Sequence, residues 1–526
     1  MLNKKILFPV FICFILAVVG CSNNDSATNN QETEDVDKED NNLTLAYDAT
    51  FVSLDPHDSD QNLDFSGFST MYEGLFEFDK DMELEPVLAT DYEESEDGTV
   101  YTIELREDVE FHDGTDFDAE AAKKNIDRLS DSDNQLTKHS LVSMVESTEA
   151  TDTYELEIEL EKPYSSFINN LAHPSLKMIS PDALEEWDDD ISKHPVGTGP
   201  FEFDEWEEGE HLKVDKFDNY WEEDLPKVDK LTFKSVPEDQ SRVNMLKTGE
   251  VDFIFPIPSN LADDTEGEDG IDVDSDTSVI TWYLSMNMNK EPFDDPKVRE
   301  AINYAIDKEA FLEVSQDGFG EIATSPIAPD VEYYEEQDVE DHDPEKAKEL
   351  LAEAGYEDGF ETKIWGANDP ERVKTMEFLQ AQLAEIGIEA KVDPMETGVL
   401  DDKINSVEDG ENKEQDMYFA GWSPSNGTAE GLIEPLFKGD QIPPDGNNTA
   451  FYNDDKVNDL IEEAMYEEDD EISEQKFKET QEEIWNDVPV SFLAYDATIS
   501  AKRDYVEGIY YKPDGSISVK EAEINQ

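Results

Sequence analysis

The pattern that most constrains the fold is a helix followed, after one glycine, by a strand. Asp369-Pro370 begins this helix, because aspartate is a good N-cap and proline is favoured at the first helical position. Apolar residues then recur at helical spacing, Gly387 ends the helix, and a strand is predicted over 388–392. Asp295-Pro296 and Asp343-Pro344 begin two more such helices. Helices that alternate with strands in this way indicate an α/β fold.

Three short segments alternate apolar and polar residues and predict half-buried strands. Their apolar positions are Leu43, Leu45 and Tyr47, then Tyr101, Ile103 and Leu105, then Leu156, Ile158 and Leu160. Folding is therefore expected to begin near Leu43. With 526 residues, 37% of them hydrophobic, the chain is long enough for two or more domains with cores of their own.

The N-terminus has the pattern of an export signal. Lys4 and Lys5 precede an apolar run over 6–19, which is too short to span a bilayer comfortably. The run ends in Val-Val-Gly-Cys21, which resembles the bacterial lipobox, where the cysteine receives a diacylglycerol and becomes the new N-terminus. We therefore predict a lipoprotein signal peptide over 1–20, lipid attachment at Cys21, and a location on the extracellular face of the cell membrane. The other cysteine, Cys13, lies in the removed segment, so the mature protein has no disulfide.

Acidic residues dominate the charge of the chain. Residues 21–42 are polar and acidic and predict a flexible tether. There are 133 Asp and Glu against 39 Lys and Arg, a net charge of −94, which excludes nucleic acid as a partner. The acids are spread along the chain, and none lies in a loop of the calcium-binding pattern. We interpret them as a solvated surface suited to a salt-rich, halophilic habitat, where salt screens the repulsion.

No motif of an enzyme is present. The seven histidines are scattered singly, so a metal site built by the protein is not expected. There is no G-x-S-x-G, no H-E-x-x-H and no phosphate-binding glycine loop with its lysine. The sequence thus predicts a protein that is not an enzyme and has no cofactor.

Several motifs together resemble a known family. They are Leu105 to Ala119 (with FHDGT at 111–115), Pro195 to Phe201 (PVGTGPF), Leu246 to Asp252 (LKTGEVD) and Phe293 to Ala301 (FDDPKVREA). They resemble the oligopeptide, dipeptide and nickel group of bacterial extracellular solute-binding proteins, family 5, and the likeness runs from Leu43 to the C-terminus. Segments at 72–76, 167–174, 253–258, 421–427, 448–452 and 512–515 resemble the glutathione-binding members of that group.

The resemblance implies an α/β, two-lobed, type II periplasmic-binding-protein-like fold (cluster C). The larger lobe would carry an extra subdomain, and the ligand would lie in the cleft between the lobes as they close. On this sequence, lobe I would span 43–285 with a subdomain inserted at about 86–194. Lobe II would span 286–494, and 495–526 would return to lobe I. The two crossings would fall near 284–287 and 494–496.

The resemblance also implies the function. The chain would be the monomeric substrate-binding lipoprotein of an ABC importer that captures glutathione or a similar short peptide and delivers it to the membrane permease subunits. A nickel chelate bound by the same fold, a receptor for peptide signals, and an extracellular peptidase are the alternatives.

The resemblance further suggests which residues hold the ligand. In dipeptide binders an aspartate in the loop after Gly421-Trp422 grips the amino terminus, whereas this chain has Ser425 there, with Ser423 before it. Asn426, Thr428 and Glu430 are nearby alternatives. Trp422 is expected in the cleft wall, with a core position as the alternative.

Dipeptide binders place an arginine for the ligand carboxylate at the junction 365–369, where this chain has Asn368 and, one turn later, Arg372 and Lys374. A surface ion pair is the alternative role for Arg372. Trp282 stands where the glutathione-type pattern has an arginine, and either walls the cleft or packs at the hinge. The predicted ligand-binding set is Tyr72, Thr198, Gly199, Trp282, Asn368, Arg372, Trp422, Ser423, Ser425 and Thr428, with a structural turn as the alternative for 198–199.

Overall fold

The computed structural model of the chain describes residues 41–525 except 60, 81, 407–413, 425, 468 and 514. Residues 41–526 form one compact unit. The predicted signal peptide, Cys21 and the tether up to residue 40 lie outside the described residues.

The predicted α/β class and the three predicted helix starts are confirmed. The helices are α7 (Pro296–Ala305), α9 (Pro344–Glu353) and α10 (Pro370–Glu385). The side chains of Asp295, Asp343 and Asp369 each accept a hydrogen bond of 2.9 Å from a backbone N–H in the first helical turn. After α10, strand β15 (Ile388–Met395) begins at the predicted residue and runs three residues beyond the predicted end.

An 11-stranded sheet runs through the unit. In the order of the sheet its strands are β15, β14 (Phe360–Ala367), β16 (Met417–Trp422), β12 (Ile271–Met286), β17 (Val490–Arg503), β11 (Phe253–Phe255), β1 (Asn42–Tyr47), β10 (Lys230–Ser235), β9 (His211–Lys216) and β8 (Phe201–Glu207), with β13 (Glu321–Ile322) paired to β17.

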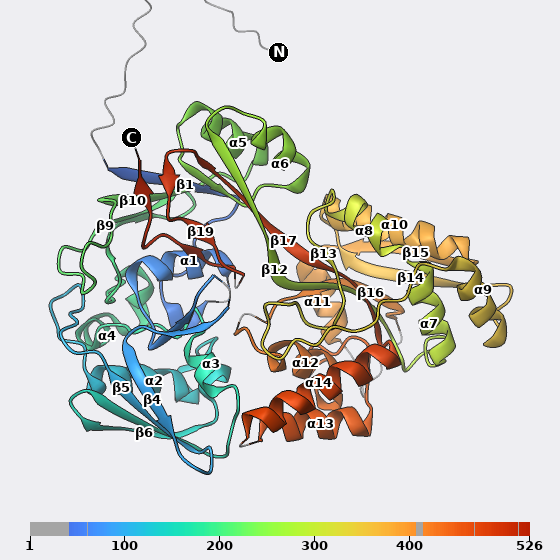
Figure 1. Cartoon of the computed structure of the whole chain (residues 1–526), viewed down its shortest axis with the longest axis horizontal. Coiled ribbons are helices and arrows are strands. Elements are labelled where there is room, and N and C mark those ends of the chain that lie inside the picture. Colours follow the sequence, from blue (N-terminus) through green and yellow to red (C-terminus); the bar gives the residue numbers. More distant parts are fainter. Residues whose placement is uncertain are drawn as a thin grey trace, which may run out of the picture. The chain divides into compact units, whose positions relative to one another are not determined.

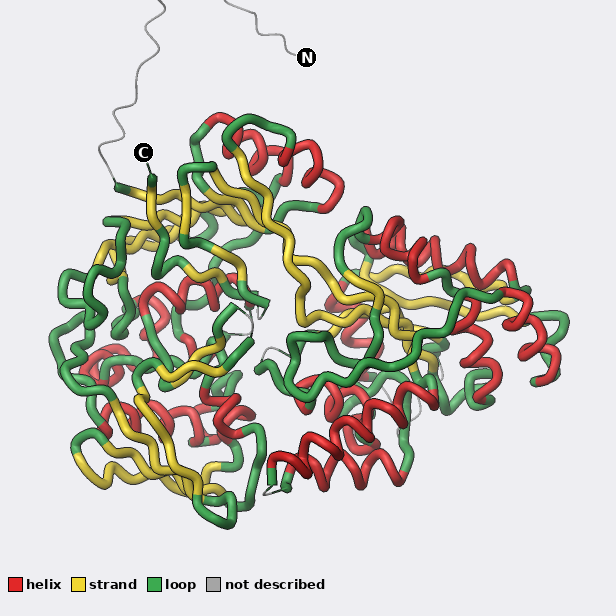
Figure 2. The backbone as a smooth tube through the Cα atoms, viewed as in Figure 1, coloured by secondary structure: helices red, strands yellow, loops and turns green. Residues whose placement is uncertain are grey.

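The long strands β12 and β17 join the two halves of this sheet. They pair antiparallel from Ile271 opposite Arg503 to Ser285 opposite Val490, and Figure 2 shows them as the yellow connection between the halves. We call residues 41–270 and 504–525 lobe I, and residues 287–489 lobe II. The crossings predicted near 284–287 and 494–496 fall at the end of β12 and within β17.

Lobe I combines its part of the large sheet with a second, four-stranded antiparallel sheet. The second sheet has the order β4 (Ala89–Glu94), β5 (Val100–Leu105), β7 (Glu155–Leu160), β6 (Val145–Asp152), and α2 (Ala119–Ser130) packs on it. The three strands predicted from alternating apolar and polar residues are confirmed as β1, β5 and β7. The remaining elements are β2 (Phe76–Phe78), β3 (Leu84–Pro86), α1 (Asn62–Met71), α3 (Phe167–Leu171), α4 (Pro181–Trp187), α5 (Asp239–Thr248), α6 (Ser259–Glu266), β18 (Val506–Glu507), β19 (Tyr510–Tyr511), β20 (Ile517–Ser518) and β21 (Glu523–Ile524).

Lobe II places parallel strands β15, β14 and β16 beside the crossing strands. Helices α7 to α10 share one apolar core with these strands. The other helices are α8 (Lys308–Ser315), α11 (Thr397–Asn405), α12 (Glu430–Phe437), α13 (Asp455–Met465) and α14 (Asp470–Asp487). Helices α12 to α14 share an apolar cluster with the four-stranded sheet of lobe I, and in Figure 1 they lie on the side of lobe II that faces α3. In the part of the chain that the structure describes, no helix has the length and apolar character to cross a membrane.

Candidate functional site

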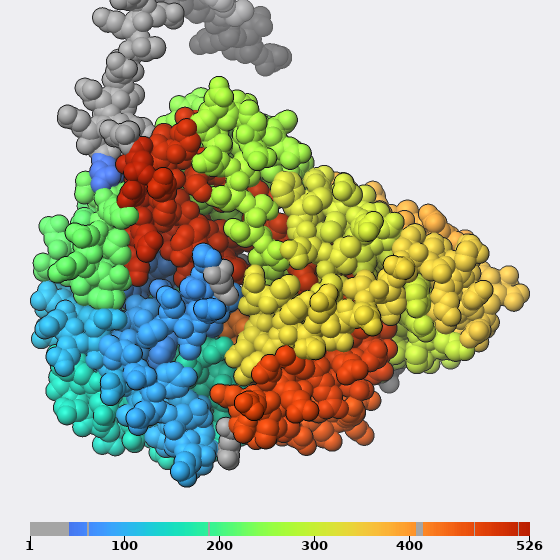
Figure 3. Space-filling model, in the orientation of Figure 1, coloured from blue at the N-terminus to red at the C-terminus, as the bar shows by residue number. Residues whose placement is uncertain are grey.

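The two lobes touch through the segment around α3 on lobe I. Asn169 donates to Glu332 with an Nδ2–Oε2 distance of 3.1 Å. Asn426 donates to Asn170 at the same distance. The backbone N–H of Ser165 donates to the carbonyl of Met465 at 3.1 Å. In Figure 3 the blue surface of lobe I meets the yellow and orange surface of lobe II along the same seam.

A pocket of about 420 Å³, which we call the interlobe pocket, lies at this contact. Both lobes line it, and the loop around Gly427 packs beside it, since a Cβ there would lie 2.8 Å from Met82. Its lobe I residues are Phe78, Met82, Leu84, Tyr92, Glu94, Tyr101, Ser165, Ile168 and Asn169, and its lobe II residues are Pro329, Asp330, Val331, Glu332, Tyr333 and Asp470. The pocket is thus partly aromatic and strongly acidic.

Two carboxyl groups of the interlobe pocket, those of Glu94 and Glu332, have raised pKa values. Burial, with the nearby charge of Asp470, raises the pKa of Glu332 to about 7. Burial is also the main cause of a raised pKa at Glu94, to which the charge of Asp470 adds. The hydroxyl of Tyr101 donates to Glu94 at 3.1 Å. A positive charge in the pocket would favour the ionised carboxylates and so lower these pKa values.

Beside the pocket, Glu430 forms a buried contact between the lobes. The Tyr164 hydroxyl of lobe I donates to Oε1 of Glu430, whose other oxygen, Oε2, has no hydrogen-bond partner. Only 5% of Glu430 is exposed, and burial raises the pKa of this carboxyl to about 7. Glu430, considered in the sequence as a possible ligand anchor, is therefore occupied by the lobe contact.

The loop after β16 contains several of the predicted ligand-binding residues. The indole N–H of Trp422 donates to the carbonyl of Gly431 at 2.8 Å. The hydroxyl of Thr428, which is 1% exposed, accepts from the Gly431 N–H at 3.1 Å. Ser423 is half-buried between them in sequence, and Ser425 lies outside the described residues. Trp422 and Thr428 therefore shape the loop that meets lobe I.

Trp282, Asn368 and Arg372 lie at a second groove between the lobes, of about 570 Å³. The lining of this groove is Asp48, Asp239, Pro256, Ile257, Pro258, Ser259, Asn260, Ser315, Gln316, Phe319, Asp369, Pro370, Glu371, Asp496, Ala497 and Ile499. None of the three predicted residues is in that lining, but each neighbours it. Arg372 lies over the Trp282 ring, 5.4 Å from Cζ to the ring centroid, and pairs with Asp369 at 3.5 Å. Asn368 is exposed at the end of β14.

Trp282 lies on β12, one of the two strands that connect the lobes. Its ring stacks on Phe419 at a centroid distance of 5.4 Å, and its indole hydrogen bonds to Asp496. Gln316 also donates to Asp496, at 3.1 Å. Burial raises the pKa of Asp496 to about 6. Gly421 is required opposite the tryptophan, because a Cβ would lie 2.9 Å from its ring.

Tyr72, Thr198 and Gly199 lie inside lobe I, and Thr198 contacts a carboxylate, Glu73, that the sequence analysis did not single out. Glu73 is 6% exposed and accepts from the Thr198 hydroxyl at 2.9 Å, from Tyr220 at 2.7 Å and from the Trp221 indole at 3.0 Å. Tyr72 is 1% exposed and donates to the Leu54 carbonyl at 3.0 Å. The adjacent aromatic pair at 220–221 is the one sequence feature that could have pointed to this network.

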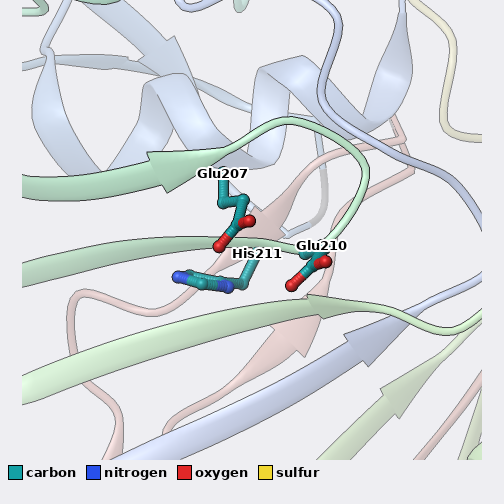
Figure 4. Close-up of side chains that lie close together, drawn as sticks. All are labelled: Glu207, Glu210 and His211. Atoms are coloured by element: carbon teal, nitrogen blue, oxygen red, sulfur yellow. The ribbon is translucent and has the colours of Figure 1, made fainter.

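Three potential metal ligands lie together at the turn between β8 and β9, as Figure 4 shows. Glu207, Glu210 and His211 each offer one donor atom, and these atoms lie within 4.8 Å of one another. His211 also lies 3.3 Å from Glu205. The trio belongs to the edge of the large sheet in lobe I and lines neither groove between the lobes.

Comparison with known proteins gives consistent likenesses. The family model for bacterial extracellular solute-binding proteins, family 5 (middle), matches residues 83–444. The chain is 40% identical over 485 residues to the glutathione-binding protein GsiB of Pectobacterium atrosepticum, a match that covers 92% of this chain and 94% of that protein.

Two solved structures extend the comparison. The periplasmic binding protein DppA of Helicobacter pylori, in complex with the peptide STSA, superposes with a TM-score of 0.76 at 29% identity, covering 92% of this chain and 98% of that one. NikZ of Campylobacter jejuni, in complex with Ni(L-His), gives a TM-score of 0.75 at 25% identity, covering 90% and 96%. The predicted two-lobed fold is confirmed by these likenesses.

Proposed function

The chain belongs to the bacterial extracellular solute-binding proteins of family 5, and from that premise we propose that it is the ligand-capturing lipoprotein of an ABC importer for glutathione or a similar short peptide. The observation that carries the proposal is a ligand-sized pocket whose walls come from both lobes. The relative named as glutathione-binding and the neighbour that holds a peptide support the ligand class.

The ligand would be captured by closure of the two lobes, because both lobes line the interlobe pocket. A ligand that contacts both lobes favours the closed form by its differential affinity for that form. The strands β12 and β17 are the covalent connections about which the lobes would move. Permease subunits would recognise the closed form, and the ATPase of the importer would supply the energy. The ligand would be released unchanged, because the proposed role includes no catalytic step.

The predicted ligand-binding residues fall into three groups, which lie in different places in the structure. Trp422, Ser423 and Thr428 belong to the loop beside the interlobe pocket, and of these we propose that the half-buried Ser423 meets the ligand, whereas Trp422 and Thr428 hold the loop through Gly431. For Ser425, which lies outside the described residues, the ligand role stays a prediction. For Trp282, Asn368 and Arg372 the ligand role stays a prediction tied to the second groove. Tyr72, Thr198 and Gly199 form the third group. For these three residues the buried contacts of Thr198 with Glu73, of Tyr72 with Leu54 and of Gly199 with the backbone at 70–72 favour a structural role.

The proposal that the protein is anchored to the membrane is based on the sequence of residues 1–42. We propose export by the signal at 1–20 and lipidation at Cys21, so that the folded unit is tethered outside the membrane. Replacing Cys21 by Ser should abolish labelling by a radioactive fatty acid and leave the signal segment 1–20 attached to the chain. Labelling that persists in the Cys21→Ser chain would contradict the anchor.

Calorimetric and thermal-shift titrations test which ligand the protein binds. Residues 41–526, which form one compact unit, are titrated in high salt with glutathione and with di- to pentapeptides. Saturable one-to-one binding of glutathione or of a short peptide is expected. Absence of binding to every peptide tested would contradict the proposal.

A nickel chelate is the second candidate, because NikZ holds Ni(L-His) in a similar structure. Titration with Ni²⁺ in the presence and absence of histidine distinguishes the two ligands. The His211→Ala variant is the control, since it removes the surface trio of potential metal ligands without altering either groove between the lobes. Histidine-dependent binding that persists in this variant would favour the chelate over the peptide.

A further inference from the structure

The interlobe pocket combines acidic and aromatic side chains, and this composition discriminates among short peptides. We propose that the interlobe pocket is a subsite for a cationic side chain, so that the preferred ligands are short peptides with a lysine or arginine side chain placed to enter it. The inference rests on the proposed function and narrows its ligand class.

The negative charge of the pocket lining favours a cationic ligand group. Its lining contains four carboxylates, those of Glu94, Asp330, Glu332 and Asp470, and no lysine, arginine or histidine among the described residues. The charge of Asp470 acts on both Glu94 and Glu332, which lie on different lobes. A cation between them would offset this repulsion and would be attracted by all three carboxylates.

The tyrosine rings of the pocket lining also favour a cationic ligand group. Tyr92, Tyr101 and Tyr333 line the same pocket, and Tyr92 is 38% exposed although it is a large aromatic residue. The face of a tyrosine ring attracts an ammonium or guanidinium group. A peptide without a cationic side chain would gain neither this contact nor the carboxylate contacts from a side chain in the pocket.

The spacing of the carboxylates favours an organic cation over a metal ion. Among the described residues, only Glu207, Glu210 and His211 bring three potential metal-ligand atoms within 4.8 Å of one another. The pocket carboxylates are therefore too far apart for three of them to share one ion. A volume of about 420 Å³ has room for an extended side chain, which can reach carboxylates on both walls.

The position of the pocket ties cation binding to lobe closure. Glu94 belongs to β4 of lobe I, whereas Glu332 belongs to lobe II and already accepts a hydrogen bond from Asn169 of lobe I. A guanidinium group held by Glu94 and Glu332 would contact both lobes at once. Such a contact stabilises the closed form more than the open form.

Two matched tripeptides test the subsite by calorimetry at one fixed salt concentration. Gly-Arg-Gly and Gly-citrulline-Gly have nearly the same shape, but only the first carries a guanidinium charge. The wild-type protein is expected to bind the arginine peptide about 10-fold or more tightly than the citrulline peptide, as for hydrogen bonds to charged groups. Glu332→Gln and Asp470→Asn should each remove most of that preference.

Glu345→Gln is the matched control, because Glu345 is exposed on α9 and its loss changes the net charge of the chain by the same amount. The control should keep the preference for the arginine peptide. Asp470 is exposed, so Asp470→Asn is expected to fold even if Glu332→Gln does not. Equal affinity for the two tripeptides in the wild-type protein would overturn the subsite and leave the proposed function standing. Failure to bind either tripeptide or glutathione would contradict the proposed function itself.

Discussion

The carboxyl group of Glu430 is buried where the two lobes meet. Glu430 is hydrogen bonded to Tyr164 of the other lobe through one oxygen and leaves the other without a partner. Ionising such a group costs free energy, because the charge is removed from water without full compensation. The contact is therefore more stable when Glu430 is protonated.

Replacement of Glu430 by glutamine should change the pH dependence of stability. Burial raises its pKa from 4.5 to about 7, so its contribution to the free energy of unfolding is full below pH 4.5 and is lost as the pH rises through 7. Glu430→Gln stays neutral and should gain stability relative to wild type between about pH 5 and about pH 8, by up to about 3 kcal/mol. Urea unfolding at both pH values measures the difference. An unchanged difference between variant and wild type at the two pH values would contradict the raised pKa.

Gly199 tests whether the 198–199 loop has a structural role. A Cβ there would lie 2.6 to 2.8 Å from backbone atoms of Thr70, Met71 and Tyr72, so Gly199→Ala should destabilise the fold by about 1–3 kcal/mol. The variant should keep the ligand affinity of its folded fraction, as measured by calorimetry well below the unfolding temperature. Gly398→Ala is the control, since nothing lies within 4 Å of its Cβ position. A loss of affinity without a loss of stability would instead favour the predicted ligand contact.

At the scale of elements, the loop from β16 to α12 meets α3 and closes one side of the site. Asn426 of this loop donates to Asn170 at 3.1 Å. The contact exists only where the lobes meet, so its loss should disfavour closure without altering the pocket lining.

Asn426→Ala should therefore weaken ligand binding by about 2- to 10-fold, since one hydrogen bond contributes about 0.5–1.5 kcal/mol. Asn458→Ala is the control, because Asn458 makes its hydrogen bond within lobe II, to the Gly439 N–H. Calorimetry with the same peptide compares the two variants. Equal affinity of Asn426→Ala and wild type would show that the contact does not contribute to closure.

The sequence predicted elements whose causes are local. Asp-Pro caps and glycine stops act within one turn, which is why α7, α9 and α10 begin where expected. The interlobe pocket could not be predicted in this way, because Tyr92, Asp330 and Asp470 come from distant segments and each reads as an ordinary exposed residue. The resemblance to a family gave the two lobes, but it gave no means of telling Tyr72 in the interior from Trp422 beside the lobe contact.

At the scale of the molecule, the net charge of −94 opposes compaction. Salt shortens the range of this repulsion from about 10 Å at 0.1 M to about 3 Å at 1 M. The melting temperature should therefore rise as NaCl is increased over this range. Sucrose at matched osmolality is the control, since it does not screen charge. A melting temperature that is independent of NaCl would contradict the interpretation of the acidic surface as salt-adapted.

The proposed role depends on capture of a small peptide between the two lobes. Titration calorimetry of residues 41–526 with glutathione and short peptides tests it most directly. We expect saturable binding of one peptide per chain, with peptides that carry a cationic side chain bound more tightly than glutathione. No measurable binding of any peptide, under conditions where the protein is folded, would contradict it.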